Sequence, residues 1–244
     1  MPTAPPTVCL IDTGLPAGAF GSGVVAGGIN LSGTGDPADI VSPVSRHGGD
    51  MAATILAHCP AARLVVLRVL DENGWLLDRQ RLDMAFGWVV AQRAELGISV
   101  VCAALADDSH QADDGPYAGT PLQSAIAALR KAGVPTVAPA GNLYPRFCLA
   151  QPGGMAWPAI LRDVVSVAAL DPVTPSRLHP YSQRLQASTG SPCATTLHEL
   201  PGAPGQTSGA AAVVAGRLAA LRQAFPAASV DELLARAVRS PSGG

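Results

Sequence analysis

Residues 8–14 read Val-Cys-Leu-Ile-Asp-Thr-Gly, an apolar run that ends at an acidic residue and a turn-forming glycine. A continuous apolar run of this length is typical of a strand that is buried on both faces of a sheet. Similar runs recur at 64–69, 98–102, 134–138 and 164–168. We therefore expect a parallel sheet in which Asp12 lies at the end of a strand.

Segments with helical periodicity lie between these runs. Apolar side chains recur at helical spacing in 78–96, and Thr120 and Pro121 are suited to open a further helix. A helix is also expected over about 208–221, and residues 229–232 (Ser-Val-Asp-Glu) form a capping-box pattern before a last helix. Alternating strands and helices predict an α/β fold with a parallel sheet.

The remaining parts of the chain give no sign of a second domain. Segments 13–46 and 171–206 are rich in Gly, Pro and Ser, with weaker periodicity, and are expected to form loops with short strands. We find neither an internal repeat nor a domain linker. The sequence therefore predicts a single domain over residues 1–244.

Composition limits the classes of partner. The chain is 48% hydrophobic and 14% charged, its formal net charge is -2, and no run of five like charges occurs, which argues against nucleic acid as a partner. No apolar segment approaches the length of a membrane span, and no secretory signal pattern is present at the N-terminus. Five cysteines without CxxC spacing favour reduced thiols. We expect a cytoplasmic protein without a membrane partner.

Polar residues with catalytic potential occur in short segments set among small or apolar residues. They are Asp12-Thr13-Gly14, His47-Gly48, Gly141-Asn142 and Thr207-Ser208-Gly209. Taken singly, each has an ordinary explanation, such as a turn, a polar surface residue or a helix N-cap. Taken together they supply an acid, a base, an amide donor and a nucleophile. Unrelated folds carry this triad in different chain orders. The order Asp, His, Ser therefore predicts a serine hydrolase with one of these folds and excludes the folds that carry the triad in another order.

Two other enzyme classes fit the sequence less well. Asp-Thr-Gly after an apolar strand is also typical of aspartic peptidases, but these need two such carboxylates and the chain has one copy. An α/β-hydrolase would show Gly-x-Ser-x-Gly and the order Ser, acid, His. The spacing around Ser208 and the chain order both disagree with that pattern.

The segments around these residues resemble those of the subtilisin-like serine peptidases. Residues 11–14 are similar to the catalytic-Asp segment of the family, 47–52 to its catalytic-His segment, 137–142 to its oxyanion-hole segment and 207–216 to its nucleophile segment. The resemblance covers nearly the whole chain. It implies a three-layer α/β fold, with a mostly parallel twisted sheet and helices on both faces, and a serine endopeptidase acting on a peptide or protein.

The resemblance also implies roles for individual residues. Ser208 would be the nucleophile, His47 the general base and acid, Asp12 the group that orients His47, and Asn142 an oxyanion donor. Residues that would bind the substrate are Ala104, Leu105, Ala106, Pro139, Ala140, Gly141 and Ala156. These are small or apolar, which favours a neutral side chain before the scissile bond.

A cluster of acidic residues adjoins the expected substrate pocket. Asp107, Asp108, Asp113 and Asp114 form either a solvated turn or a surface that attracts a basic peptide. The sequence leaves both interpretations open.

The chain departs from the family pattern in ways that affect its expected function. Asp50 stands where a second His is common, and Gln206 replaces a Gly two residues before Ser208. After Ser208, the usual Met, Pro and His are replaced by Gly209, Ala212 and Val213. The changes near Ser208 leave open a catalytically weak or inactive peptide-binding module, and a peptide ligase or macrocyclase using the same acyl-enzyme is a further alternative.

Compared with the family, the chain is expected to be shortened. We expect trimming of the helical segment before the catalytic Asp, of the loop that binds calcium in many relatives, and of the final strand and helix. We therefore expect no cofactor or metal, and a homo-oligomer or partner protein that covers the trimmed ends. We also expect a dedicated processing protease for a peptide or protein precursor.

Overall fold

Seven parallel strands form one sheet in the computed structural model, which describes residues 4–21, 23–189, 191–202 and 205–239. The strands are β1 (Thr7–Asp12), β2 (Val25–Asn30), β3 (Arg63–Arg68), β4 (Ile98–Ala103), β5 (Thr136–Pro139), β6 (Val164–Ala169) and β7 (Leu197–Glu199). Their order across the sheet is β2-β3-β1-β4-β5-β6-β7, and every neighbouring pair is parallel. The predicted parallel sheet is confirmed, while the single domain over 1–244 stays a prediction.

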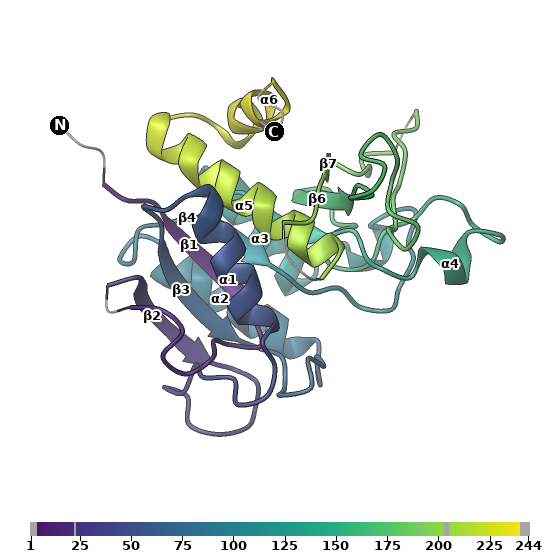
Figure 1. The fold of residues 1–244 in the computed structure, drawn as a ribbon. Coiled ribbons are helices and arrows are strands. Elements are labelled where there is room, and N and C mark those ends of the chain that lie inside the picture. The colour runs from purple at the N-terminus through teal and green to yellow at the C-terminus, as the bar shows by residue number, and fades with distance from the viewer. Residues whose placement is uncertain (1–3, 22, 190, 203–204, 240–244) are drawn as a thin grey trace.

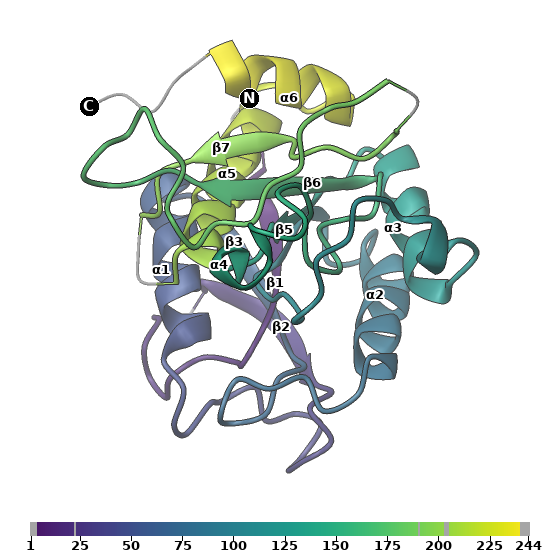
Figure 2. The ribbon, with the colours of Figure 1, turned by 90° about the vertical axis from the view of Figure 1, so that its right-hand side faces the viewer.

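Helices cover both faces of this sheet (Figures 1 and 2). They are α1 (His47–His58), α2 (Gln80–Gln92), α3 (Pro121–Lys131), the short α4 (Tyr144–Phe147), α5 (Thr207–Ala224), α6 (Val230–Arg239) and the 3₁₀ helix η1 (Gly115–Tyr117). Helices α1 and α5 lie on one face, with α6 beside α5, whereas α2 and α3 lie on the other. This arrangement confirms the three-layer α/β fold.

Strand β1 shows why its sequence is apolar without interruption. The side chains of Cys9 and Ile11 enter the core formed with α2 and α3, and those of Val8 and Leu10 enter the core formed with α1 and α5. All four are fully buried. Because successive side chains of a strand point to opposite faces, a strand covered on both faces must be apolar at every position.

Helix ends follow the expected capping chemistry. Thr120 Oγ1 accepts a hydrogen bond from Gln123 N at 3.3 Å, with Pro121 in the first turn. Ser229 Oγ accepts from Glu232 N at 3.2 Å, and Glu232 accepts from Ser229 N at 2.7 Å, which is the reciprocal capping box.

One helix is shorter than predicted. Helix α2 spans Gln80–Gln92, whereas the periodicity predicted a helix over 78–96. Residues 93–97 continue as turns in which Ile98 N donates to Arg93 O at 2.9 Å, and Gly97 adopts a φ of 64°. The apolar pattern extends past the helix because the turn also packs on the sheet.

The sheet has one point where the chain changes direction across it. From β1 the chain passes to β2 on one side, and from β4 it passes to β5 on the other. In open parallel sheets, ligands bind outside the carboxyl ends of the strands at such a switch point. Asp12 ends β1, and Ala104 directly follows β4. The fold thus places these residues at the expected binding crevice.

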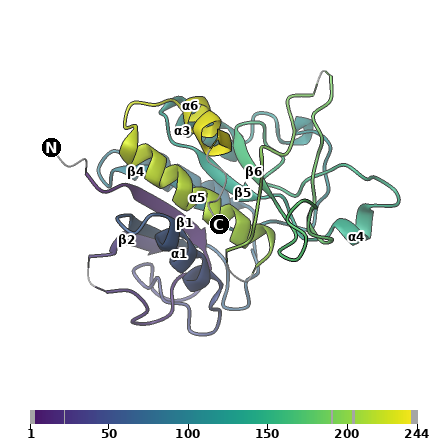
Figure 3. The ribbon, with the colours of Figure 1, turned by 45° about the horizontal axis from the view of Figure 1, so that its top comes forward.

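Helix α5 lies across the sheet and packs closely on α1 (Figures 1 and 3). Its first three turns carry Ala, Val and Gly and are buried nearly all round. At Gly216 the two helices approach closely, since an added Cβ would lie 2.7 Å from the carbonyl oxygen of Ile55 in α1. Small side chains therefore set the distance between the two helices.

Substitution of Gly216 tests this packing. We expect Gly216→Ala to lower the free energy of unfolding by about 1–3 kcal/mol, because the methyl group must displace the α1 backbone. Gly87→Ala in α2 is the matched control: a Cβ there meets nothing within 4 Å, so alanine should stabilise by about 0.5–1 kcal/mol. Urea unfolding measures both. Equal stability of Gly216→Ala and wild type would contradict the proposed tight contact.

Candidate active site

A buried carboxylate and a histidine form the centre of the site. Asp12 has no exposed surface, and both its carboxylate oxygens lie 2.8 Å from His47 Nδ1. Thr13 N also donates to Asp12 Oδ1, at 2.5 Å. Because a carboxylate only accepts hydrogen bonds, His47 Nδ1 must carry a hydrogen. The other ring nitrogen, Nε2, is therefore available as a base.

Two glycines allow helix α1 to begin this close to β1. Gly48 N donates to Thr13 Oγ1 at 3.1 Å. A Cβ at Gly48 would lie 2.0 Å from the carbonyl oxygen of Gly14, and one at Gly49 would lie 2.6 Å from Pro16 Cδ. A side chain at either position would push α1 away, so the glycines after His47 bring its ring within reach of Asp12.

The surroundings of His47 raise its pKa above the usual 6.5. Burial lowers this pKa, but the charge of Asp12, its hydrogen bond and the charge of Asp50 together outweigh the burial. Asp50 lies one turn further along α1 than His47. Asp50, which stands where a second His is common in the family, therefore helps to raise the pKa of His47.

Ser208 and Asn142 lie on the same side of the molecule as His47. Ser208 is the second residue of α5, and its hydroxyl donates to the carbonyl oxygen of Ala104 at 3.3 Å. Asn142 Oδ1 accepts hydrogen bonds from Thr207 N at 3.2 Å and from Thr207 Oγ1 at 2.7 Å. These two bonds fix the orientation of the amide, which leaves its Nδ2 donor for a group bound in the pocket.

One pocket of about 590 Å³ joins these side chains. His47, Ser208 and Asn142 line it. Of the residues expected to bind substrate, Ala104, Leu105 and Ala106 also line it. The further lining residues are Thr13, Ser45, Leu70, Asn73, Gly74, Trp75, Leu76, Arg79, Asp107, Asp108 and Leu143. Trp75 is 65% exposed and gives the rim a large apolar surface.

The other residues expected to bind substrate do not line this pocket. Pro139, Ala140, Gly141 and Ala156 are buried. Ala156 N donates to Ala140 O at 2.9 Å, so the two segments pack on each other rather than facing the pocket. Gly141 directly precedes Asn142 in the chain, and Ala156 packs on Gly141, where an added Cβ would lie 2.9 Å from Ala156 Cβ.

The acidic cluster is not a simple solvated turn. Asp114 is fully buried and accepts from Arg162 Nε at 2.7 Å and Arg162 Nη2 at 2.6 Å. These hydrogen bonds are the main cause that lowers the pKa of Asp114. Asp107 pairs with Arg79 and accepts from Trp157 N at 3.1 Å. Asp108 is exposed at the pocket. Two of the four acids are therefore structural.

Several residues that the sequence analysis missed support the site. Thr13 accepts a hydrogen bond from Gly48 N, and Thr207 donates one to Asn142 Oδ1. The sequence could have indicated these supporting roles, because each threonine directly adjoins a proposed catalytic residue in the same short segment. Gln183, discussed below, stands alone in a loop-rich segment and gave no signal.

Gln206 adopts an unusual backbone conformation beside Ser208. Its φ of 53° and ψ of -110° lie in a region that favours glycine. It precedes α5, and its carbonyl oxygen accepts a hydrogen bond from Ala210 N at 3.0 Å. The chain thus keeps the conformation of a glycine at a position where it carries a side chain.

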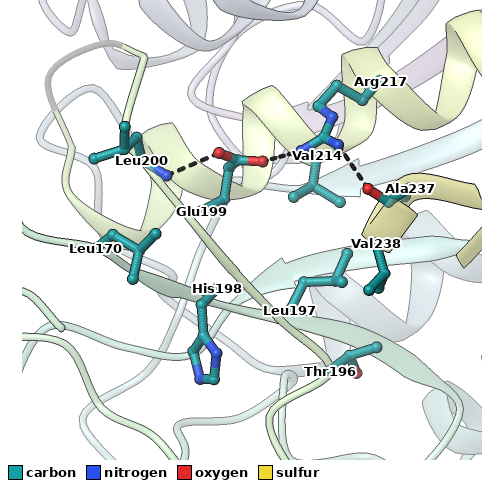
Figure 4. A pocket seen from close by; sticks show the side chains of 10 residues that line it. All are labelled: Leu170, Thr196, Leu197, His198, Glu199, Leu200, Val214, Arg217, Ala237 and Val238. Carbon is teal, nitrogen blue, oxygen red and sulfur yellow. Dashed lines mark hydrogen bonds and ion pairs between the residues drawn. The ribbon is translucent and has the colours of Figure 1, made fainter. Parts of the chain in front are cut away.

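A second pocket, of about 460 Å³, lies at the other end of the sheet between β7, α5 and α6 (Figure 4). Apolar side chains such as Leu197 and Val214 line it, and Glu199 pairs with Arg217 at its wall. It shares no lining residue with the first pocket. The prediction that a second copy or partner covers the trimmed ends stays a prediction.

Two kinds of feature are absent from the part of the chain that the structure describes. Among these residues no helix is long and apolar enough to cross a membrane. Within the same residues, no group of three or more His, Cys, Asp or Glu side chains is placed to hold a metal ion.

Comparison with known proteins identifies the family of the chain. The chain matches the model of the subtilase family over residues 4–241. Sphericase is similar in structure, with a TM-score of 0.73 and 19% identity over 96% of this chain and 82% of that chain. A lanthipeptide protease is also similar, with a TM-score of 0.70 and 21% identity over 98% of this chain and 80% of that chain. At these identities the two likenesses show the fold. A search of curated proteins found no match.

The titration of His47 tests the electrostatics of the site. We expect NMR to give a pKa above 6.5 for His47. Asp12→Asn should lower it most and Asp50→Asn should lower it less, because each removes a negative charge that favours the imidazolium. Asp231→Asn on α6 is the control and should leave it unchanged. A pKa of His47 that does not respond to Asp50→Asn would contradict the assignment.

Substitution of Gln206 tests the backbone strain. Relative to Gln206→Ala, which keeps a side chain at positive φ, Gln206→Gly should raise the free energy of unfolding by about 1 kcal/mol. Glycine relieves the backbone strain of the folded state, which raises the free energy of unfolding. It also increases the conformational entropy of the unfolded chain, which offsets part of this gain. Urea unfolding of the two variants gives the difference directly, and equal stabilities would show that the conformation is unstrained.

Proposed function

Because the chain belongs to the subtilase family, we propose that Asp12, His47 and Ser208 are the catalytic triad of this subtilisin-like serine protease, with Asn142 as an oxyanion donor. The family assignment makes the protein a hydrolase that acts on peptide or protein substrates. One observation carries the assignment of residues. His47, Ser208 and Asn142 line a single pocket, and the Asp12 carboxylate lies directly behind His47.

The proposed reaction begins with the Ser208 hydroxyl. It turns from Ala104 O toward His47, and Nε2 of His47 takes its proton as the oxygen attacks the substrate carbonyl carbon. The imidazolium that forms is stabilised by Asp12, which stays ionised. His47 then protonates the leaving amine, and the acyl group remains on Ser208. Water, activated by the same histidine, releases the acyl group and restores the hydroxyl.

Charge on the substrate oxygen would be stabilised by Asn142 Nδ2, a donor that is fixed before the reaction. Thr207 holds Asn142 Oδ1, so Nδ2 need not reorient when the oxyanion develops. The backbone N–H of Ser208, in the first turn of α5, is the second proposed donor, although in this structure it donates to Gly205 O at 3.0 Å. Donors held in place in a partly buried site are worth more than the same groups in water.

The lining of the pocket supports a neutral side chain before the scissile bond. Ala104, Leu105 and Ala106 present small or apolar surface, and Trp75 extends it at the rim. Pro139, Ala140, Gly141 and Ala156 would shape this region from behind. Of the two acidic residues in the pocket lining, Asp107 pairs with Arg79, so attraction of a basic peptide segment would depend on the exposed Asp108.

We further propose that the enzyme processes a peptide precursor inside the cell. One similar structure is a lanthipeptide protease, which acts on a peptide of that class. All five cysteines of this chain are unpaired, which fits a reducing compartment such as the cytoplasm. The first observation supports a dedicated processing role over bulk digestion, and the second supports a location inside the cell.

The test is cleavage of a peptide library, followed by mass spectrometry in H₂¹⁸O, with Ser208→Ala as control. We expect products that carry ¹⁸O and a preference for neutral residues before the cut, and a loss of roughly 10⁶-fold in turnover for Ser208→Ala. Products lighter by one water would favour a macrocyclase. Binding without cleavage would favour a peptide-binding module, and either outcome would contradict the proposed hydrolysis.

A further inference from the structure

The buried residue Gln183 contacts Gly141 and Leu143, the two chain neighbours of Asn142. Gln183 has no exposed surface. Its side-chain Oε1 accepts from Leu143 N at 3.2 Å, and its backbone N donates to Gly141 O at 2.8 Å. A Cβ at Gly141 would lie 2.2 Å from Gln183 Oε1, which shows how closely the two residues fit. Gln183 thus holds the backbone on either side of Asn142.

The partners of Gln183 determine which way its amide points. Leu143 N is a donor, so the atom facing it must be the oxygen. Gln183 Nε2 donates to Ser109 O at 2.9 Å, and a carbonyl can only accept. Both ends therefore require the same orientation. The second hydrogen on Nε2 points to His110 Nδ1, at 2.8 Å.

His110 is consequently confined to one neutral form. Its Nδ1 must accept from Gln183, and its Nε2 must donate to Gln151 O at 2.9 Å. The ring is 9% exposed and stacks on Phe147 with a centroid distance of 4.6 Å. Neither nitrogen can change its role without losing a hydrogen bond.

We propose that Gln183 is a positioning residue for Asn142, and that neutral His110 holds Gln183 in the required orientation. The inference rests on the proposed function, in which Asn142 is the oxyanion donor. A proton on His110 Nδ1 would set two donors against each other, at His110 and at Gln183 Nε2. The amide of Gln183 would then turn or withdraw, and the segment Gly141–Leu143 would lose its support.

The electrostatics around His110 agree with a neutral ring. Burial lowers the pKa of His110, the hydrogen bond to Gln151 raises it, and the charge of Arg184 lowers it, with a net decrease from 6.5. Arg184 stacks over Tyr144 and donates to Ser182 O at 2.7 Å. On the loop of His110 itself, Asp107 is committed to Arg79.

The two histidines should therefore act at different pH. As pH falls, His47 gains a proton first because its pKa is raised, and this removes the general base. His110 gains its proton at lower pH. The slope of log(kcat/KM) against pH should steepen from about one to about two below the pKa of His110.

A double-mutant cycle tests the positioning role. Gln183→Met keeps the length of the side chain but removes its hydrogen bonds, and should lower kcat roughly 10- to 100-fold with little change in KM. In the Asn142→Ala background, the same change should cost much less, because the positioned donor is already gone. Losses that multiply fully, or a rise in KM with unchanged kcat, would overturn the proposal.

The pH dependence has its own variants. His110→Gln can offer an oxygen to Gln183 and an N–H to Gln151 without titrating, so it should keep kcat near wild type and remove the steep part of the profile. His198→Gln is the matched control, since burial also lowers the pKa of His198 at the distant β7 edge. It should keep the steep part. A wild-type slope that stays near one would overturn the proposed role of His110.

A measurement on the wild-type protein separates this inference from the proposed function. Long-range ¹⁵N NMR should show His110 with its hydrogen on Nε2 and a pKa below 6.5, and the Leu143 amide signal should shift as His110 titrates. If no peptide is cleaved, the proposed function fails, while these signals still decide the hydrogen-bond network. A hydrogen on Nδ1 at neutral pH would overturn it.

Discussion

The buried carboxylate of Asp12 is the constraint on which the site depends. A charged group without exposed surface is costly unless it is hydrogen-bonded, and its partners here are His47 Nδ1 and Thr13 N. The parallel sheet sets Asp12 at the carboxyl end of β1, an interior strand that lies between β3 and β4. Helix α1 must begin beside it to bring His47 into contact, and Gly48 and Gly49 are what allow this approach.

Small residues also allow the close approach of the other elements that form the site. Helix α5 lies close to α1 because Gly216 and its alanine neighbours present little bulk, and this brings Ser208 to the pocket that His47 faces. Asn142 reaches that pocket from the end of β5, where Thr207 turns its amide. Close packing at these small residues therefore brings the other proposed catalytic groups to the Asp12–His47 pair.

Much of this could be predicted from the sequence because the signals are local. Uninterrupted apolar runs identified buried strands, Thr120 and Ser229 identified helix starts, and short motifs identified the residues that meet at the pocket. Signals that depend on tertiary contact were lost. Neither the burial of Asp114 by Arg162 nor the link from His110 through Gln183 to Leu143 has a periodicity or spacing that a sequence could reveal. That Pro139 and Ala156 do not line the pocket also depends on tertiary packing.

The most direct test of the central claim is intact-mass analysis after reaction with a fluorophosphonate. This probe reports whether Ser208 is activated by the Asp12–His47 pair, independently of any natural substrate. We predict one adduct per chain, located on Ser208 by peptide mapping, no adduct in Ser208→Ala and strongly slowed labelling in Asp12→Asn. An unlabelled wild type, or an adduct that persists in Ser208→Ala, would contradict it.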